Sequence, residues 1–255
     1  KELWRYKDLF YFLVWRDVKT RYAQSVLGIG WAVIQPIFSM IVFTIVFGKL
    51  AKINSDGVPY AIFSYTALVP WTYFSGALTG ASGSLLGASG MMTKVYFPRL
   101  IIPMAPVMSK LIDFGIAFVI LLLMMVYFGF MPSIQIIYLP LLILIMMITA
   151  SGMGMWLTAM AVKYRDINYA MSFFVQLLMY AAPVVYPASI IPEPFRLIYG
   201  CFPMVGVIEG FRSILLKTNP MPWDLIGVGS IVACFLFISG AFYFRRMEKY
   251  FADIA

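Results

Sequence analysis

The stretch "FGIAFVILLLMMVYFGFMPSIQIIYLPLLILIMMITASGMGMWLTAMAV", residues 114–162, holds 49 consecutive positions without a formal charge. A helix needs about 20 apolar residues to cross the hydrocarbon core of a bilayer, so the run is long enough for two crossings. The segment "GFMPS" at 129–133 interrupts the run with Gly and Pro, which favour a turn. The stretch therefore predicts two membrane-spanning helices joined by a tight turn.

Further uncharged runs cover residues 22–48, 57–93, 167–192 and 225–244. The composition also indicates a membrane protein, because 62% of the 255 residues are hydrophobic and 12% are charged, whereas soluble domains carry about 25% charged residues. We expect an all-α polytopic fold with a cytoplasmic amphipathic interface helix at residues 1–28 and a six-helix transmembrane domain at residues 29–255. The six spans are predicted at about residues 29–50, 60–84, 104–129, 135–161, 168–188 and 224–244.

The distribution of positive charge predicts the orientation. Six spans place both termini on one side, and that side collects 14 of the 19 Lys and Arg residues. Because Lys and Arg are enriched in cytoplasmic loops, both termini are expected in the cytoplasm and the protein in the inner (cytoplasmic) membrane. The same rule, together with anionic membrane lipid, accounts for the net charge of +8 without nucleic acid as a partner.

The first 22 residues read as an amphipathic helix. Six of their charged side chains fall on about a third of the helix circumference, which predicts a helix lying on the inner leaflet. A cytosolic extension of the first span is the alternative. The six residues are Lys1, Glu2, Arg5, Asp8, Arg16 and Lys19.

The segment between the fifth and sixth spans is rich in proline. Its two apolar pieces, within residues 189–217, are too short to cross a bilayer, so they predict re-entrant or interfacial helices on the periplasmic side. We expect an outer gate there, in which Glu209 and Arg212 pair one turn apart. The predicted gate residues are Phe202, Pro203, Glu209 and Arg212.

Several kinds of chemistry find no support in the sequence. The chain has no His, no GxxxxGK[ST] loop, no HExxH and no GxSxG, so we expect no ATP site, metal or other cofactor on it. This argues against a membrane-embedded glycosyl- or acyltransferase, and the lack of mid-span carboxylates argues against an ion-coupled carrier. Asp113, one turn after Lys110, is expected to be neutralised by it, with a proton or ion site as the alternative. Cys201 and Cys234 read as two lone thiols, although a disulfide is possible.

Two helix faces combine aromatic rings with an amide. Such faces suit sugars, because rings stack on C–H faces while amides bond hydroxyls, although helix packing or lipid contact is the alternative. We expect them to line a channel. The predicted lining residues are Trp31, Gln35 and Phe38 in the first span, and Tyr169, Phe173, Gln176 and Tyr180 in the fifth.

Glycine recurs at alternating spacings of four and three along "GALTGASGSLLGASG", residues 76–90. Such a stripe predicts close approach of another helix. A hinge, or a backbone lining of a path, is the alternative.

Four segments resemble one family. "KVYFPRLIIP", residues 94–103, is similar to the loop between spans two and three in permease subunits of ATP-binding-cassette exporters of polysaccharides, which include O-antigen, capsule and teichoic-acid exporters. "RYAQSVLGIGWAVIQPI" (21–37), "KYRDI" (163–167) and "EGFRSILL" (209–216) resemble the family at matching places in the topology. The resemblance spans the chain from end to end.

The resemblance implies a transport subunit without enzymatic activity of its own. Two copies would form the conduit as a homodimer, and two copies of a separate ATPase subunit would bind ATP and Mg²⁺. The cargo would be a lipid-linked polysaccharide, with a drug or a lipid as the alternative. The residues implied in coupling to the ATPase are Lys94, Tyr96, Phe97, Pro98 and Arg99, with Arg165 and Asp166 as a second contact.

Overall fold

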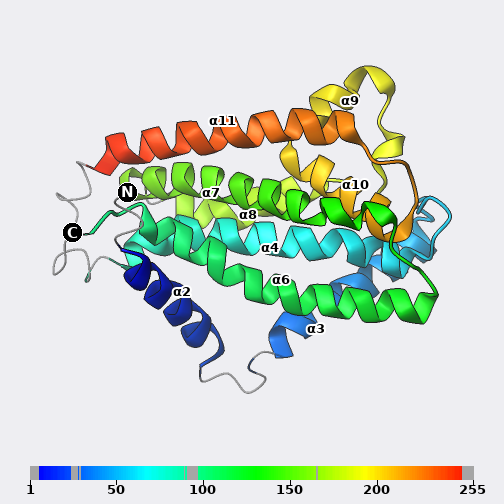
Figure 1. The fold of residues 1–255 in the computed structure, drawn as a ribbon, viewed down its shortest axis with the longest axis horizontal. Coiled ribbons are helices and arrows are strands. Elements are labelled where there is room, and N and C mark those ends of the chain that lie inside the picture. The colour runs from blue at the N-terminus through cyan, green and yellow to red at the C-terminus, as the bar shows by residue number, and fades with distance from the viewer. Residues whose placement is uncertain are drawn as a thin grey trace.

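The computed structural model describes residues 6–23, 28, 30–88, 90, 97–164 and 166–248. This part of the chain is helical throughout apart from short connections, which confirms the all-α class (Figure 1). The helices are α2 (Lys7–Tyr22), α3 (Gly30–Phe43), the π-helix η1 (Thr44–Leu50), α4 (Tyr60–Gly87), α6 (Ile101–Phe128), the 3-10 helix η2 (Ile134–Tyr138), α7 (Leu139–Lys163), α8 (Asp166–Ala181), the 3-10 helix η3 (Ala188–Ile190), α9 (Glu193–Gly200), α10 (Pro203–Leu216) and α11 (Trp223–Met247).

Four helices in the described part of the chain are long and apolar enough to cross a membrane. They are α3 with η1, α6, η2 with α7, and α11, which correspond to the predicted first, third, fourth and sixth spans. α6 begins at Ile101, three residues before the predicted boundary, because Pro103 is tolerated in the first turn of a helix. The start of α2 and the end of α11 lie at the same end of the bundle (Figure 1).

The helices at the predicted second and fifth spans, α4 and α8, differ from those four. α4 has 28 residues, about 42 Å at 1.5 Å per residue, but it is less apolar because it runs through the centre of the bundle (Figure 1). Its buried hydroxyls all find acceptors: Thr66 Oγ1 donates to the Ile62 carbonyl of its own helix at 2.8 Å, whereas the Tyr73 hydroxyl donates to the Val107 carbonyl of α6 at 3.1 Å. A helix that is covered by protein needs no apolar face toward lipid.

The predicted end of the fifth span at residue 188 is wrong. α8 has 16 residues and ends at Ala181, and the chain then turns. The cause is Pro183, since proline disfavours helical geometry at the residue before it. η3 lies beyond this turn and already belongs to the segment that leads into α9.

Glycines bring α7 and α11 into close contact. A Cβ on Gly152 would lie 2.6 Å from the Phe237 backbone nitrogen, and one on Gly240 would lie 2.5 Å from the Gly152 carbonyl oxygen. The glycine stripe of α4 behaves as predicted over only part of its length. Gly76 and Gly80 pack on α6, whereas a Cβ at Gly83, Gly87 or Gly90 would meet no atom within 4 Å among the residues that the structure describes.

Candidate functional site

The loop that precedes α6 holds the predicted coupling residues, of which Phe97, Pro98 and Arg99 are described. The Phe97 ring is only 4% exposed, in a cluster with residues of α4, α7 and α11. Phe97 therefore faces the interior of the single chain. Arg99 is partly exposed, and its Nη1 donates to the Glu248 carbonyl at the end of α11.

Three of the predicted coupling residues, Lys94, Tyr96 and Arg165, lie outside the described residues. Asp166 is exposed at the first position of α8. A carboxylate at the start of a helix is stabilised by the helix dipole, so Asp166 has a local role that needs no partner protein.

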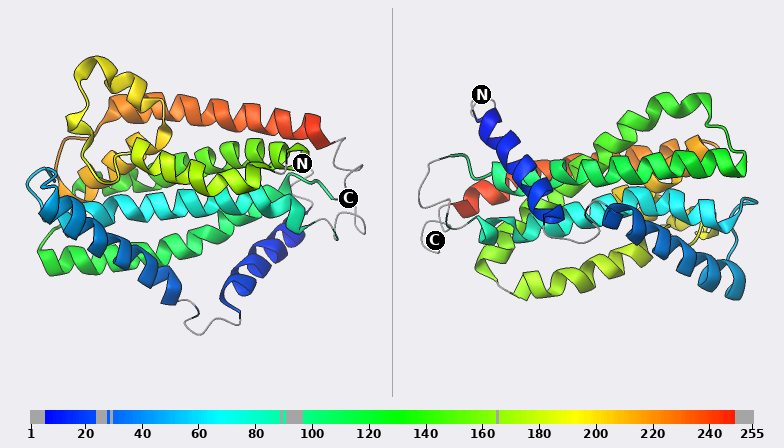
Figure 2. Two further views of the ribbon diagram at one scale, coloured as in Figure 1. Left: turned by 180° about the vertical axis from the view of Figure 1, so that it is seen from behind. Right: turned by 90° about the horizontal axis from the view of Figure 1, so that it is seen from below.

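The predicted channel-lining residues all point out of the single chain. Trp31, Gln35 and Phe38 on α3 are exposed, and so are Tyr169, Phe173, Gln176 and Tyr180 on α8, with Tyr169 reaching 85%. Both helices contact α4 and lie on the same face of the bundle (Figure 2). The two aromatic faces thus belong to one side of the molecule, although they come from opposite halves of the sequence.

The predicted outer gate is a pair of helices bent sharply against each other. α9 and α10 meet at 107°, with Phe202 and Pro203 at the break. Every residue of α10 is buried, and the helix packs on α4, α7 and α11. α9, by contrast, exposes Phe195, Leu197 and Ile198.

The predicted pairing of Glu209 with Arg212 is confirmed, with Arg212 Nη1 2.7 Å from Glu209 Oε1. The Arg212 side chain is completely buried. Its Nη1 also donates to the Tyr186 carbonyl, its Nη2 donates to the Val184 carbonyl at 3.0 Å, and its guanidinium lies 3.6 Å from the centre of the Phe63 ring. One side chain therefore ties α10 to α4 and to the turn after α8.

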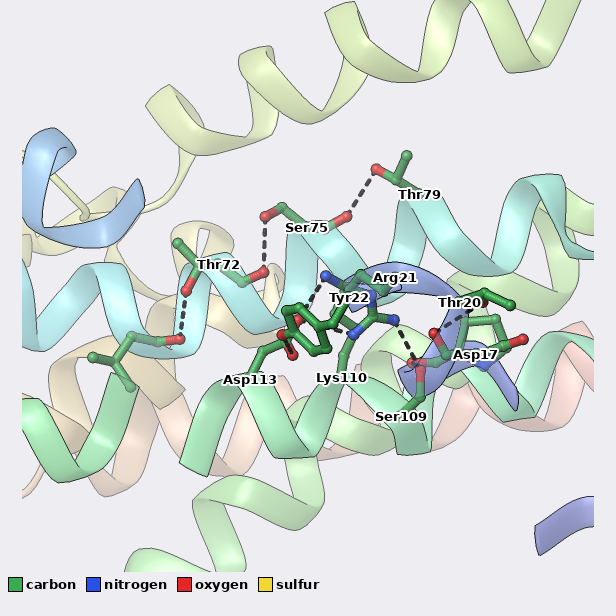
Figure 3. A network of polar contacts seen from close by, with 12 residues as sticks. Asp17, Thr20, Arg21, Tyr22, Thr72, Ser75, Thr79, Ser109, Lys110 and Asp113 are labelled. Carbon is green, nitrogen blue, oxygen red and sulfur yellow. Dashed lines mark hydrogen bonds and ion pairs between the residues drawn. The ribbon is translucent and has the colours of Figure 1, made fainter. Parts of the chain in front are cut away.

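A polar junction between α2 and α6 includes the Lys110–Asp113 pair (Figure 3). Lys110 Nζ lies 2.8 Å from Asp113 Oδ2, as expected, but Arg21 Nη1 approaches the same oxygen at 2.9 Å. Arg21 Nη2 also donates to Ser109 Oγ, and the Tyr22 hydroxyl donates to Asp113 Oδ1. The sequence analysis missed Arg21 and Tyr22, although they open the segment "RYAQSVLGIGWAVIQPI" that carries the family resemblance.

The Tyr22 hydroxyl stays protonated in this junction. Burial is the main cause that raises its pKa to about 12, and the hydrogen bond to Asp113 adds to the effect. Tyr22 therefore remains a hydrogen-bond donor at any physiological pH. With Arg21 and Lys110, it gives the single carboxylate of Asp113 three donors. Arg21 and Tyr22 come from α2 and hold its end against α6, whereas Lys110 lies on α6 itself.

A cleft of about 370 Å³ lies beside this junction, between α2, α4 and α6. α2 contributes charged and polar side chains, and α4 contributes mainly glycine. The lining residues used below are Arg16, Asp17 and Arg21 of α2, Gly83 and Gly87 of α4, and Pro106 of α6.

The described residues contain no cluster of His, Cys, Asp or Glu suited to a metal ion. Cys201 and Cys234 are both free and exposed. The possible disulfide between them is therefore not formed. Among the described side chains, the features that stand out are the two exposed aromatic faces, the buried Arg212 and the charged junction with its cleft.

Comparison with known proteins places this helical bundle in a family. The ABC-2 type transporter family matches residues 8–216, which include the junction and the bent helix pair. The chain belongs to the ABC-2 type transporter family. This membership confirms the resemblance drawn from the four sequence segments.

Relatives in this family match the chain over almost its whole length. An O-antigen export system permease protein RfbA from Myxococcus xanthus is 26% identical and covers 100% of this chain and 98% of the relative. A Klebsiella pneumoniae protein of the same name is 24% identical, covering 97% and 95%. The polysialic acid transport protein KpsM of Escherichia coli is 20% identical, covering 91% of each chain.

Proposed function

We propose that this chain is the permease subunit of an ABC exporter that moves a lipid-linked polysaccharide across the cytoplasmic membrane. Its end-to-end similarity to permeases named for O-antigen export carries the proposal. Two copies of the chain form the conduit, and two copies of a separate ATPase subunit drive it. ATP and Mg²⁺ bind to the partner, and both termini of this chain lie in the cytoplasm.

The exposed aromatic faces support a path between two copies. A face that is open in one chain lines a closed path only when a second chain covers it. The α3 and α8 faces present rings with Gln35 and Gln176 among them, and this combination suits a hydrated sugar chain. We assign Trp31, Phe38, Tyr169, Phe173 and Tyr180 to this lining.

In the proposed topology α4 and α8 complete the six spans, and α9 with α10 is re-entrant on the outer side. The burial of α10 supports this, because backbone that enters a membrane and returns must be covered by protein. α2 lies on the inner leaflet, with Leu13 packed on α6 and with Tyr11, Phe12 and Trp15 exposed. Aromatic side chains favour the headgroup region of a bilayer.

We assign the contact with the ATPase to the loop before α6. Because Phe97 is buried, it holds the loop on the bundle, and Lys94, Tyr96 and Arg99 make the contact. The hydrogen bond from Arg99 to the end of α11 connects this loop to the last span. Movement of a bound ATPase would thereby reach α4, α7 and α11 through the cluster around Phe97.

The proposal is tested by co-purification followed by complementation. The tagged chain, isolated from its native membrane, should bring down an ABC ATPase. The two proteins together should restore surface polysaccharide in cells that lack their own O-antigen permease, whereas the same pair with the P-loop Lys of the ATPase changed to Ala should not. Restoration without an active ATPase, or isolation of the chain without any ATPase, would contradict the proposal.

A further inference from the structure

The cleft between α2, α4 and α6 lies beside a group of charges that do not balance. Among the residues that the structure describes, five charged side chains gather there, namely Arg16, Asp17, Arg21, Lys110 and Asp113. Asp17 pairs with Arg16 at 3.0 Å, and Asp113 is shared by Arg21 and Lys110. Three cations therefore meet two carboxylates, and one positive charge of the group is left over.

Arg21 can direct the surplus positive charge toward the cleft. Arg21 is both a partner of Asp113 and a lining residue of the cleft, whereas Lys110 is not in the lining. If Arg21 turned toward an anion in the cleft, Lys110 Nζ would stay 2.8 Å from Asp113 Oδ2 and keep that carboxylate paired. Arg21 can therefore change its partner without leaving a buried charge alone, which would be costly.

The space in the cleft is also open on the α4 side. A Cβ at Gly83 or Gly87 would meet no atom of the described residues within 4 Å, so no described helix packs against these two glycines. The volume of about 370 Å³ exceeds what a single phosphoryl group needs. Arginine binds a phosphoryl group through two parallel N–H donors, a geometry that a fork-shaped guanidinium provides.

We propose that this cleft is a binding site for a phosphoryl group, with Arg21 as its main ligand and Arg16 as the second. When Arg21 releases Asp113, the Asp113 carboxylate keeps its ion pair with Lys110. The site goes beyond the transport path and the ATPase contact proposed above, and it does not depend on either. A phospholipid headgroup and free phosphate share this chemistry, so the experiment distinguishes them.

The first arm of the test changes charge. The full chain is placed in nanodiscs of phosphatidylcholine, and two probes are titrated separately, phosphatidylglycerol by native mass spectrometry and inorganic phosphate by calorimetry. Arg21→Gln should weaken binding by about tenfold or more, the scale of a charge-assisted hydrogen bond. Lys19→Gln is the matched control, because it removes the same charge from the same helix outside the cleft, and it should change binding by less than about twofold.

The second arm changes volume and leaves every charge in place. Gly83→Leu should fill the cleft and abolish binding, whereas Gly83→Ala adds one methyl group to open space and should bind as the wild type does. Both substitutions favour a helix over glycine, so α4 is expected to remain folded.

The outcomes distinguish a phospholipid headgroup from free phosphate, and some of them would refute the proposed binding site. Binding of phosphatidylglycerol alone identifies a lipid headgroup, and binding of phosphate alone identifies a soluble ligand. Binding of neither probe by the wild type, equal losses for Arg21→Gln and Lys19→Gln, or unchanged binding by Gly83→Leu would each refute the proposal. Because no ATPase and no export enter this assay, its failure would leave the proposed transport function standing, and the reverse also holds.

Discussion

At the scale of single residues, Arg212 holds together the bent helix pair and its surroundings. Its fully buried guanidinium meets a carboxylate, two backbone carbonyls and an aromatic ring. The pair with Glu209 could be predicted because positions three apart share a helix face. The carbonyls of Val184 and Tyr186 could not, since they lie in a turn that only the tertiary structure brings to α10.

Because Arg212 has these extra partners, replacing Arg212 should destabilise the protein more than replacing Glu209. Glu209→Gln keeps an oxygen acceptor for the Ala188 amide and leaves Arg212 its two carbonyls, but it removes the carboxylate beside a fully buried guanidinium. We therefore expect a loss of about 3 kcal/mol, the lower end of the cost of breaking a buried ion pair. Arg212→Met strands a buried carboxylate and two carbonyls, which should cost about 3–5 kcal/mol. Thermal unfolding in detergent compares the two variants. Equal melting temperatures, or a lower one for Glu209→Gln, would show that Arg212 does not act as this brace.

Replacing Phe97 and replacing its neighbour Tyr96 should have different effects, on the stability of the protein and on its coupling to the ATPase respectively. Phe97→Ala removes a buried ring from the cluster with α4, α7 and α11 and should destabilise the protein by about 3 kcal/mol or more. Tyr96→Ala should weaken coupling to the ATPase, in line with the contact proposed for this residue. Unfolding and stimulated ATP hydrolysis, measured on both variants, check this division. A Phe97→Ala protein with wild-type stability and lost coupling would restore the docking role expected from the sequence.

At the scale of elements, uncharged runs located the spans but did not show how the helices are arranged. The run at 114–162 correctly predicted α6 and α7 with a turn between them. The central position of α4 was not predictable, because its lower hydropathy reflects cover by neighbouring helices. The glycine stripe in α4 predicted close approach of another helix, which the structure shows at Gly76 and Gly80, but no stripe indicated that Gly152 and Gly240 bring α7 and α11 together.

The α7–α11 contact yields a paired prediction. Gly152→Ala would place a methyl group 2.6 Å from the Phe237 backbone nitrogen, which cannot move independently of its helix. We expect a loss of about 1–3 kcal/mol from overpacking. Gly227→Ala in α11 meets open space and should be neutral or stabilising by up to about 1 kcal/mol. Melting temperatures that do not differ between the two variants would mean that the helices are less tightly packed than described.

At the scale of the whole molecule, the account depends on what covers the exposed face of α3 and α8. The sequence predicted the residues of this face from their helical spacing, and all seven are exposed in the single chain. It could not predict that the two helices share one side, because their placement against α4 is a tertiary property (Figure 2). The proposed path requires that a second copy covers this face and that sugar passes along it.

The most direct measurement is the amount of polysaccharide exported per ATP hydrolysed, with the ATPase partner present. In Tyr169→Ala/Phe173→Ala/Tyr180→Ala, three rings that each contribute about 0.5 kcal/mol are lost, so export per ATP should fall by roughly tenfold. The control Leu123→Ala/Val126→Ala trims the exposed surface of α6 and should export as the wild type does. An unchanged ratio in the triple variant, or an equal loss in the control, would contradict a sugar path along α8.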